Sequence, residues 1–594
     1  MPRVADYVME RLQEQGVRHV FLVSGRGALF LTDAVARLKT MSAVCMHHEQ
    51  SAAFAAAAYA QHSGGPGVCL VSTGCAATNT LTGVLSAWQD GLPCIFISGQ
   101  NTLAETTRYT GKALRTFGQQ EADIVSIVAS ITKYAVMITD PASIAHELDK
   151  ALFLAMSGRP GPVWIDIPLD IQSMRVVPEE LARFVPDANL PGQPSAEDVC
   201  QVAAALRDAK RPVLLLGSGM RSAKAVDALR DFLASNPVPV TYAASAPDVI
   251  DAGDPLLIGS VGAMGCSRAG NFAVQNADLV LVVGCRLSSM VTGTDFAKFA
   301  RAARIIVVDI DPAEHAKDGV RIDRLVVADA RQFLLALTQA AAIGDTSAWR
   351  LKCQHWKTVF PRHEARQGST ERVDLHHLAD CLSRVLPADA SLVTDSGFAE
   401  IILPTNVGFS RGQRCIHPVS QGAMGFALPA IVGVHFSGDH PIVAVVGDGS
   451  VMMNLQELQT IRHHNIPAKI LIISNNAYGI IRRRQTDLFR SRTIGTDSSN
   501  GVSCPDFREV AKSFALPYAR IERAEELEPR LRDILMADGA IICEILGLEN
   551  QDYIETSLAR NSAGRLVRRP LEDQAPFLDR TTFLAEMIVE PIDQ

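Results

Sequence analysis

Several features are missing from this 594-residue sequence, and each absence excludes a class of protein. No run of about 18 apolar residues is present, so the sequence predicts no membrane-spanning helix. Lys and Arg number 56 against 64 Asp and Glu, which gives a net charge of -8 and no basic stripe for nucleic acid. The start, Met1 to Asp6, leads directly into a helical pattern and lacks the apolar core of a signal peptide.

A Cys-x-x-Cys pair is also missing, although the chain has 12 cysteines. Scattered cysteines of this kind argue against a disulfide framework and against a zinc site. They fit reduced, mostly buried thiols, so we expect a cytoplasmic protein. The missing apolar run and basic stripe predict that it binds neither membranes nor nucleic acid.

The length predicts three to four domains, and most of the chain alternates short apolar strands with helices. Such alternation is typical of an α/β fold with doubly wound parallel sheets. Two polar stretches, 176–197 and 340–372, are expected to be linkers. The expected segments are an N-terminal pyrimidine-binding domain (1–175), a central flavin-type domain (190–340), a diphosphate-binding domain (373–548) and a surface-packed tail (549–594).

The most informative motif is Gly447-Asp448-Gly449-Ser450, which follows the apolar run 442–446. A second apolar run, 470–473, leads into Asn475-Asn476. Two strand ends therefore present an aspartate and an asparagine. Oxygen ligands beside glycines can hold a hard divalent cation against a diphosphate, whereas Gly-Asp-Gly alone would fit a hairpin turn equally well.

This spacing resembles the thiamine diphosphate fingerprint of the pyruvate decarboxylase and acetolactate synthase superfamily. The resemblance implies that Asp448, the Asn476 side chain and the Tyr478 carbonyl bind Mg²⁺, which in turn binds the diphosphate. Further segments similar to acetolactate synthases extend over residues 1–548. The other residues that the resemblance assigns to the cofactor are Gly25, Glu49, Thr73, Asn79, Gln421, Gly422, Met424, Gly447, Gly449, Ser450, Gly479 and Ile480.

Glu49 lies where a strand gives way to an alanine-rich helix. The resemblance implies that its carboxyl group shares a proton with the aminopyrimidine ring of the cofactor and so activates it. The alternative is that Glu49 only caps its helix. We expect the neighbouring His47 and His48 to be structural groups rather than proton relays.

Three more residues, Gln100, Phe117 and Gln120, are implied to line the substrate pocket. Met424, in a Gly-x-Met-Gly segment, is implied to wedge between the two rings of the cofactor, and the alternative is an ordinary core methionine.

The resemblance also implies an FAD in the central segment, held without net redox use. Glycines and acidic residues at strand ends suit a dinucleotide, although glycine also serves turns. The chain reads Leu287-Ser288-Ser289-Met290 where acetolactate synthases usually have Phe-Asp-Asp-Arg, which puts the flavin in doubt. The candidate flavin residues are Arg159, Gly217, Gly219, Gly262, Arg286, Asp309 and Asp311.

We therefore expect an enzyme that decarboxylates pyruvate, a 2-oxo acid, and joins the two-carbon unit to a carbonyl acceptor. It would be a homodimer or homotetramer with shared active sites. Alternatives are transfer to a nucleotide-linked keto-deoxysugar, a flavin-dependent pyruvate oxidase, and a non-catalytic, cofactor-binding regulatory subunit. No tryptophan follows the Asn pair, and Arg482, Arg483 and Arg484 suit either an anionic acceptor or a solvated helix face.

Overall fold

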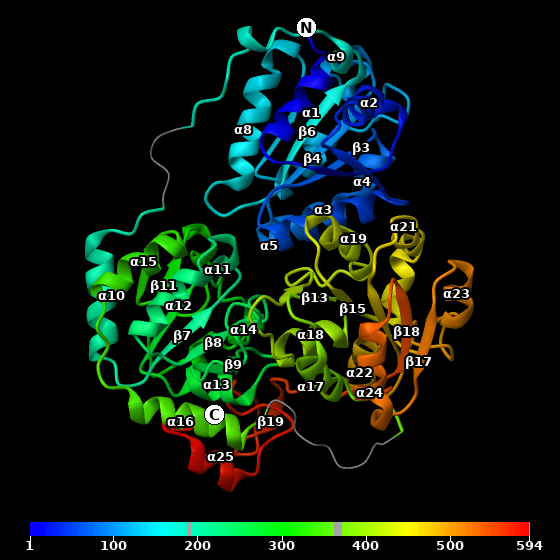
Figure 1. Cartoon of the computed structure of the whole chain (residues 1–594). Coiled ribbons are helices and arrows are strands. Elements are labelled where there is room, and N and C mark those ends of the chain that lie inside the picture. Colours follow the sequence, from blue (N-terminus) through cyan, green and yellow to red (C-terminus); the bar gives the residue numbers. More distant parts are fainter. Residues whose placement is uncertain (187–191, 362–370, 593–594) are drawn as a thin grey trace.

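The computed structural model describes residues 1–186, 192–361 and 371–592. Three six-stranded sheets organise these residues, and helices cover both faces of each sheet (Figure 1). All strand pairs in the three sheets are parallel. The predicted α/β class with three doubly wound sheets is therefore confirmed.

The first sheet has the order β2-β1-β3-β4-β6-β5. Successive residues of a strand point to opposite faces, so Val20 and Phe21 fill two different hydrophobic clusters. Its strands are β1 (His19–Leu22), β2 (Ser42–Cys45), β3 (Gly67–Val71), β4 (Cys94–Gln100), β5 (Tyr134–Met137) and β6 (Val163–Pro168). Its longer helices are α1 (Val4–Glu14), α2 (Leu29–Arg37), α3 (Glu49–Ser63), α5 (Leu81–Asp90) and α8 (Ile144–Met156).

The second sheet has the order β12-β11-β10-β7-β8-β9. Its strands are β7 (Pro212–Leu216), β8 (Val240–Tyr242), β9 (Leu257–Ser260), β10 (Leu279–Val283), β11 (Arg304–Asp309) and β12 (Arg324–Val327). Its main helices are α10 (Ala196–Asp208), α12 (Val226–Ser235), α13 (Arg268–Gln275), α15 (Ala330–Ala340) and α16 (Ser347–Val359).

The third sheet has the order β14-β13-β15-β16-β18-β17. Its strands are β13 (Ser391–Thr394), β14 (Arg414–Ile416), β15 (Ile442–Gly447), β16 (Lys469–Ser474), β17 (Tyr518–Ile521) and β18 (Ile541–Leu546). Its main helices are α17 (Leu375–Val385), α18 (Phe398–Asn406), α19 (Ala427–Ser437), α21 (Glu457–His463), α22 (Gly479–Phe489) and α24 (Leu527–Met536).

Helix α3 joins the first domain to the third. All seven residues from Ala52 to Ala58 are fully buried, and six of them are alanines, whose small side chains let α19 approach closely. A Cβ added to Gly433 of α19 would stand 2.2 Å from the Ala55 carbonyl oxygen, so only glycine fits at this crossing. The two domains thereby share one hydrophobic core.

The prediction of a second linker over 340–372 is wrong for residues 347–359, because these residues form helix α16. Trp349, Cys353 and Trp356 of this helix are buried against the central domain. These three apolar residues have the spacing of one helix face and could have predicted a helix, but the polar residues around them suggested a linker. In the first expected linker, 176–197, a 3₁₀ turn spans Pro178–Glu180 and α10 begins at Ala196, while residues 187–191 lie outside the described part.

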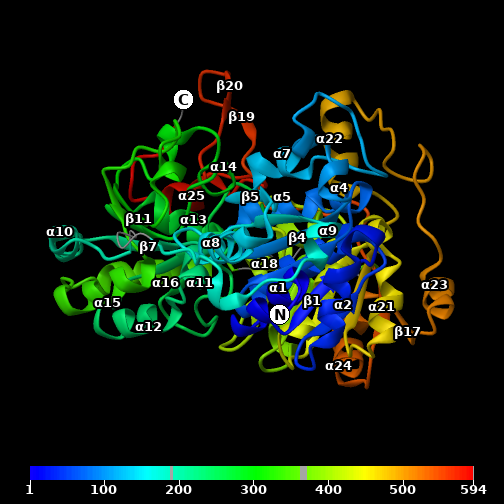
Figure 2. The same ribbon diagram turned by 90° about the horizontal axis from the view of Figure 1, so that it is seen from above.

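The tail packs against the central domain through Leu571 and Phe583 and against the third domain through Tyr553. It carries the hairpin β19 (Leu558–Arg560) and β20 (Leu566–Arg568) and the helix α25 (Arg580–Glu586); the hairpin lies at the edge of the molecule (Figure 2). Glu572 is buried and accepts a hydrogen bond from Gln275 of α13. Within the described ranges, no helix combines the length and apolar character needed to cross a membrane.

Candidate active site

The candidate cation site lies at the carboxyl ends of β15 and β16, which are paired neighbours. The Asp448 side chain is buried. Its Oδ2 accepts the backbone N–H groups of Asn475 (2.9 Å) and Asn476 (2.7 Å), and its Oδ1 accepts that of Gly449 (2.8 Å). The carboxylate is therefore fixed at the edge of the sheet before any ligand arrives.

Burial raises the pKa of Asp448 to about 6, and the three backbone N–H donors act against this shift. A cation bound at the carboxylate would favour its ionised form. Binding of a metal ion here would therefore be coupled to deprotonation of Asp448.

Asn476 and Tyr478 complete the expected ligand set. Asn476 has a left-handed backbone (φ 57°) and an exposed side chain. The Tyr478 carbonyl accepts one hydrogen bond, from the Arg482 N–H at 2.9 Å, and keeps a second lone pair.

The glycines of this turn test whether a diphosphate would fit. A Cβ on Gly447 would meet no atom within 4 Å, so open space lies beside the turn, whereas a Cβ on Gly449 would strike the Tyr478 ring at 1.9 Å. Carboxylate, amide and carbonyl oxygens are the hard donors that Mg²⁺ prefers. The residues present therefore fit a magnesium-bound diphosphate.

The loop with Gln421, Gly422 and Met424 is held by Asp395, which the sequence analysis missed. Asp395 is fully buried and accepts the N–H groups of Gly425 (3.2 Å) and Ala427 (2.7 Å) and the Ser450 hydroxyl. Its signal was available, because it follows the buried strand β13 as Asp448 follows β15. Met424 is half-buried in this loop.

Glu49 opens helix α3, but His48 caps the helix: its Nδ1 accepts the Gln50 N–H at 3.0 Å. Glu49 is the acidic residue of the first turn, so it can still stabilise the N-terminus of α3 by its charge, and His48 has a structural hydrogen bond of the kind expected for it. The half-buried Glu49 accepts a hydrogen bond on Oε2 from the Asn79 side chain at 2.9 Å. The His47 N–H donates to Glu457 of α21 at 3.1 Å.

Five other expected residues lie near the ends of β1, β3 and β4. A Cβ on Gly25 would collide with Ser72 at 2.5 Å. The Thr73 hydroxyl donates to Gln100, which is buried at 2% exposure. Phe117 is 55% exposed, and Gln120 is exposed with a left-handed backbone (φ 57°).

At the third domain, Ser450 donates to Asp395, and Gly479 packs against the Phe398 ring, which a Cβ would strike at 2.3 Å. Ile480 packs against the core of that domain. Within the described residues, no hydrogen bond joins Glu49 to Asp448. Asn454 joins their segments: its side chain accepts a hydrogen bond from the Ser51 hydroxyl at 3.0 Å and donates one to the Gln50 side chain at 3.1 Å.

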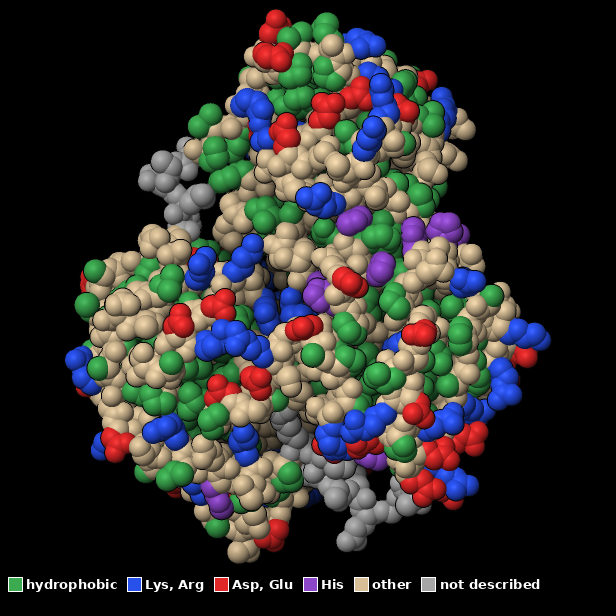
Figure 3. Space-filling model, viewed as in Figure 1, with side chains coloured by type: hydrophobic (Ala, Val, Ile, Leu, Met, Phe, Trp, Pro, Cys, Tyr) green, Lys and Arg blue, Asp and Glu red, His purple; other side chains and the backbone are tan. Residues whose placement is uncertain are grey.

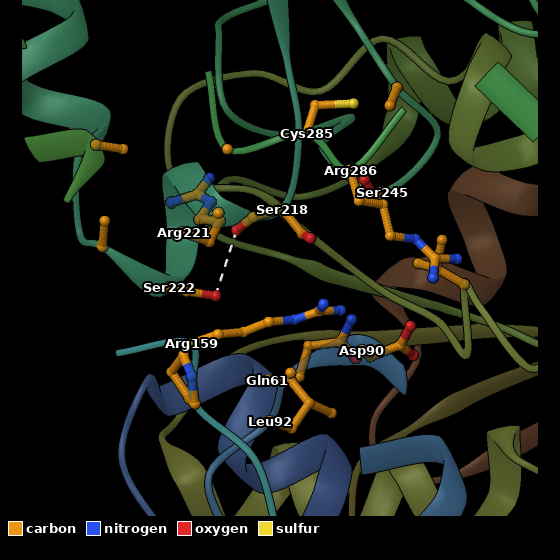
Figure 4. Close-up of a pocket in the computed structure, with 18 of the residues that line it drawn as sticks. Gln61, Asp90, Leu92, Arg159, Ser218, Arg221, Ser222, Ser245, Cys285 and Arg286 are labelled. Carbon is orange, nitrogen blue, oxygen red and sulfur yellow. Dashed lines mark hydrogen bonds between the residues drawn. The ribbon is translucent and has the colours of Figure 1, made fainter. Parts of the chain in front are cut away.

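A cavity of about 950 Å³ lies between the central domain and its two neighbours. Figure 3 shows the hollow with basic side chains along it. Figure 4 shows Arg159 of the first domain on one side of the cavity and Arg221 of the central domain on the other. Four expected flavin residues, Arg159, Gly219, Arg286 and Asp309, line this cavity. Its size is within the range of about 300–1,000 Å³ that holds ligands of cofactor size.

The remaining flavin candidates are engaged within the protein. Cβ atoms on Gly217 and Gly262 would strike the Gly284 carbonyl oxygen at 2.3 Å and the Met290 carbonyl oxygen at 2.7 Å. Asp311 caps a 3₁₀ turn and lies 3.4 Å from Arg159, which also pairs with Glu314 at 2.6 Å. Close packing explains these glycines without a flavin.

Arg482 and Arg483 of α22 are partly buried and engaged by the tail, whereas the Arg484 side chain is 50% exposed. Arg483 pairs with Glu555 of the tail at 2.6 Å, and Arg484 lies 3.8 Å from the same carboxylate. Arg482 donates to the Glu549 carbonyl at 2.6 Å. The tail therefore fixes the helix that follows the Asn pair.

Comparison with known proteins gives matches in all three domains. Three families match: "Thiamine pyrophosphate enzyme, N-terminal TPP binding domain" over residues 2–127, the corresponding "central domain" over 199–337, and the "C-terminal TPP binding domain" over 395–545. Each match falls within one of the three domains; the first ends before β5 and β6, and the third begins directly after β13.

Whole-length relatives agree with these matches. The chain is 32% identical to the probable acetolactate synthase 2, chloroplastic, of Oryza sativa subsp. japonica, over 94% of this chain and 85% of that protein. It is 33% identical to the acetolactate synthase isozyme 2 large subunit of Escherichia coli (strain K12), over 91% and 95%. The chain therefore belongs to the acetolactate synthase-like family of thiamine pyrophosphate enzymes.

Proposed function

We propose that this chain decarboxylates pyruvate with thiamine diphosphate and transfers the remaining two-carbon unit to a carbonyl acceptor. One observation carries the proposal: at adjoining strand ends, the buried Asp448 carboxylate accepts the backbone N–H of Asn476, whose own side chain is exposed. This arrangement suits a cation that anchors a diphosphate.

In this proposal Asp448, Asn476 and the Tyr478 carbonyl hold Mg²⁺. When bound, the cofactor supplies the carbanion and the electron sink for decarboxylation. Glu49 holds a proton at its carboxyl group, and the Asn79 N–H group fixes one of the two oxygens. The residues that follow Glu49 in α3, from Ser51 to Ala58, are buried and exclude water from this end of the site.

We assign the chain to a homodimer or homotetramer in which Glu49 of one copy serves the diphosphate site of another. Six exposed, large apolar side chains in the segments that carry the expected site residues support this assignment, because monomeric soluble proteins rarely expose large apolar patches. They are Tyr109, Leu114, Phe117, Met452, Met453 and Ile481, each at least 40% exposed.

FAD in the 950 Å³ cavity is a second part of the proposal, supported by cavity size and by Arg159, Arg221 and Arg286 on its walls. Heat release of a flavin from the purified protein tests it, and a colourless supernatant would contradict it. We also propose a reducing, cytoplasmic location, which the 12 free cysteines support.

The decisive experiment supplies the purified chain with Mg²⁺, thiamine diphosphate and pyruvate, and identifies the products by mass spectrometry. Acetolactate supports the plain synthase, and a tertiary alcohol formed only with an added ketone supports a ketone-accepting enzyme. Oxygen uptake with pyruvate would indicate the oxidase. If carbon dioxide is never released, the proposed function is wrong.

A further inference from the structure

Asp166 is a buried carboxyl group that the proposed chemistry does not use. It lies on β6, opposite Ser98 of β4 in the parallel register, and is 2% exposed. No lysine or arginine pairs with it among the residues that the structure describes. A buried carboxyl group without a cation costs free energy unless hydrogen bonds satisfy it, so its donors define its role.

Two side chains of β4 donate to this carboxyl group. Ser98 donates its hydroxyl to Oδ1 at 2.6 Å, and Gln100 donates Nε2–H to Oδ2 at 3.3 Å. Ser98 in turn accepts the Trp164 indole N–H at 2.9 Å. Burial raises the pKa of Asp166 to about 7; these two donors and Arg108 act against the shift, and Asp123 adds to it.

The Gln100 amide is fully used by the protein. Its second N–H donates to the Ala122 carbonyl at 3.1 Å, and its oxygen accepts from the Thr73 hydroxyl and from the Asn101 backbone N–H at 3.0 Å. The Gln100 amide cannot flip by 180°, because its oxygen would then face the Ala122 carbonyl and its N–H₂ would face the Asn101 N–H. Asp166 favours this same orientation.

The partners of Gln100 belong to the two segments that carry the expected site residues. Thr73 leads into the turn at Gly74, where a Cβ would stand 1.7 Å from the Gln120 carbonyl oxygen. Ala122 follows the loop 117–121. The other end of this loop is held by the buried Glu121, whose Oε2 accepts the Phe117 N–H at 2.8 Å.

We propose that Asp166 is a positioning residue, which orients the Gln100 amide and through it holds Thr73 and the loop 117–121 in place for the 2-oxo acid. Gln100 then acts from behind the pocket wall instead of contacting the substrate. The role toward the 2-oxo acid rests on the proposed function. The positioning of Gln100 by Asp166 does not depend on it.

Three variants separate this role from general stability. Asp166→Ala removes one of the two acceptors of the Gln100 amide and leaves the Ala122 carbonyl as the other. Asp166→Asn keeps an acceptor for Gln100 and can donate to Ser98. Ser98→Ala removes the other hydrogen bond of the same carboxyl group and leaves the Gln100 contact.

Hydrogen exchange followed by mass spectrometry reads the geometry without any turnover. We expect Asp166→Ala to speed exchange in residues 73–75 and 117–122 about tenfold, the factor that corresponds to one hydrogen bond of 1.4 kcal/mol. Asp166→Asn and Ser98→Ala should stay within about threefold of the parent. Unchanged exchange in Asp166→Ala, or equal acceleration in Ser98→Ala, would overturn the proposal.

Kinetics then tests the link to the substrate. Asp166→Ala should raise KM for pyruvate about tenfold with a smaller change in kcat, and the double variant with Gln100→Ala should be no worse than Gln100→Ala alone. Additive losses would contradict the shared role. If the parent protein turns over no pyruvate, the proposed function fails, and the exchange experiment still decides the positioning role.

Discussion

Single carboxyl groups carry most of the chemistry that we expect from this chain. Asp448 and Asp395 both follow buried strands, and backbone N–H groups hold both in place. Glu49 differs, because it is half-buried and receives one side-chain donor, Asn79. Backbone donors therefore fix the carboxylates of Asp448 and Asp395, whereas Glu49 has one carboxyl oxygen without a hydrogen-bond donor from the described residues.

Replacement of Glu49 by glutamine tests its role. The isosteric amide keeps the size of the side chain but cannot hold the proton, so pyruvate decarboxylation should fall by about 10²–10⁴-fold. Steady-state release of carbon dioxide measures this. Glu180→Gln, at an exposed glutamate of the same chain, is the control and should retain parent activity. An unchanged rate in Glu49→Gln would refute the catalytic assignment.

Asp448→Asn tests the cation site. The new amide must place an N–H₂ group against backbone N–H donors and loses the negative charge, so affinity for Mg²⁺ with thiamine diphosphate should fall by about tenfold or more. Isothermal titration calorimetry measures the affinity, with the exposed Asp533→Asn as control. Parent-like binding by Asp448→Asn would place the cation elsewhere.

At the scale of elements, the burial of two helices could not be predicted from their hydrophobic pattern. The alanine-rich α3 is buried around its full circumference, so it has no apolar stripe and gives a weak amphipathic signal. Helix α16 is the opposite case, because a polar segment contains three buried anchors. Contacts distant in sequence decide both helices.

Trp356 is the anchor of α16 that we expect to matter most. It is fully buried, its ring lies 5.7 Å from that of Phe272, and its indole N–H donates to Glu586 at 2.9 Å. Trp356→Ala should lower the free energy of unfolding by about 3–5 kcal/mol in urea titrations. Leu351→Ala, on the same helix at 65% exposure, should change it by about 0.5 kcal/mol or less. Equal effects would mean that α16 does not support the central domain.

At the scale of the whole molecule, the junction of the first and third domains is rich in histidine. His62, near the end of α3, makes hydrogen bonds with Ser391 (3.0 Å) and Ser437 (2.7 Å) of the third domain. Burial lowers the pKa of His62 to about 3; the charges of Arg414, His440 and Arg221 lower it further, and Asp248 raises it. His62 is thus neutral in the folded chain at neutral pH.

This shift predicts an acid-sensitive domain junction. The unfolded state binds the proton near pH 6.5, so the contribution of His62 to stability is complete above that pH and is lost as the pH falls toward 3. At pH 5 the loss is about 2 kcal/mol. His62→Gln should lose less stability than the parent between pH 6.5 and 5 in thermal scans, whereas the exposed His463→Gln should follow the parent. Identical pH profiles for His62→Gln and the parent would contradict this.

Local patterns in the sequence determined the α/β class, the strand ends at Asp448 and Asn476, and the helix start at Glu49. These features depend on neighbouring residues, on strand periodicity and on glycines that a turn requires. The exact domain boundaries and the role of each site residue remain predictions.

Only the tertiary structure decided which groups meet. It paired the arginines of α22 with the tail, assigned Gly217 and Gly262 to close packing, and buried Gln100 behind Thr73 on the carboxyl group of Asp166. Each of these contacts joins segments far apart in the chain. Their partners depend on sheet order and domain packing, which no local sequence pattern encodes.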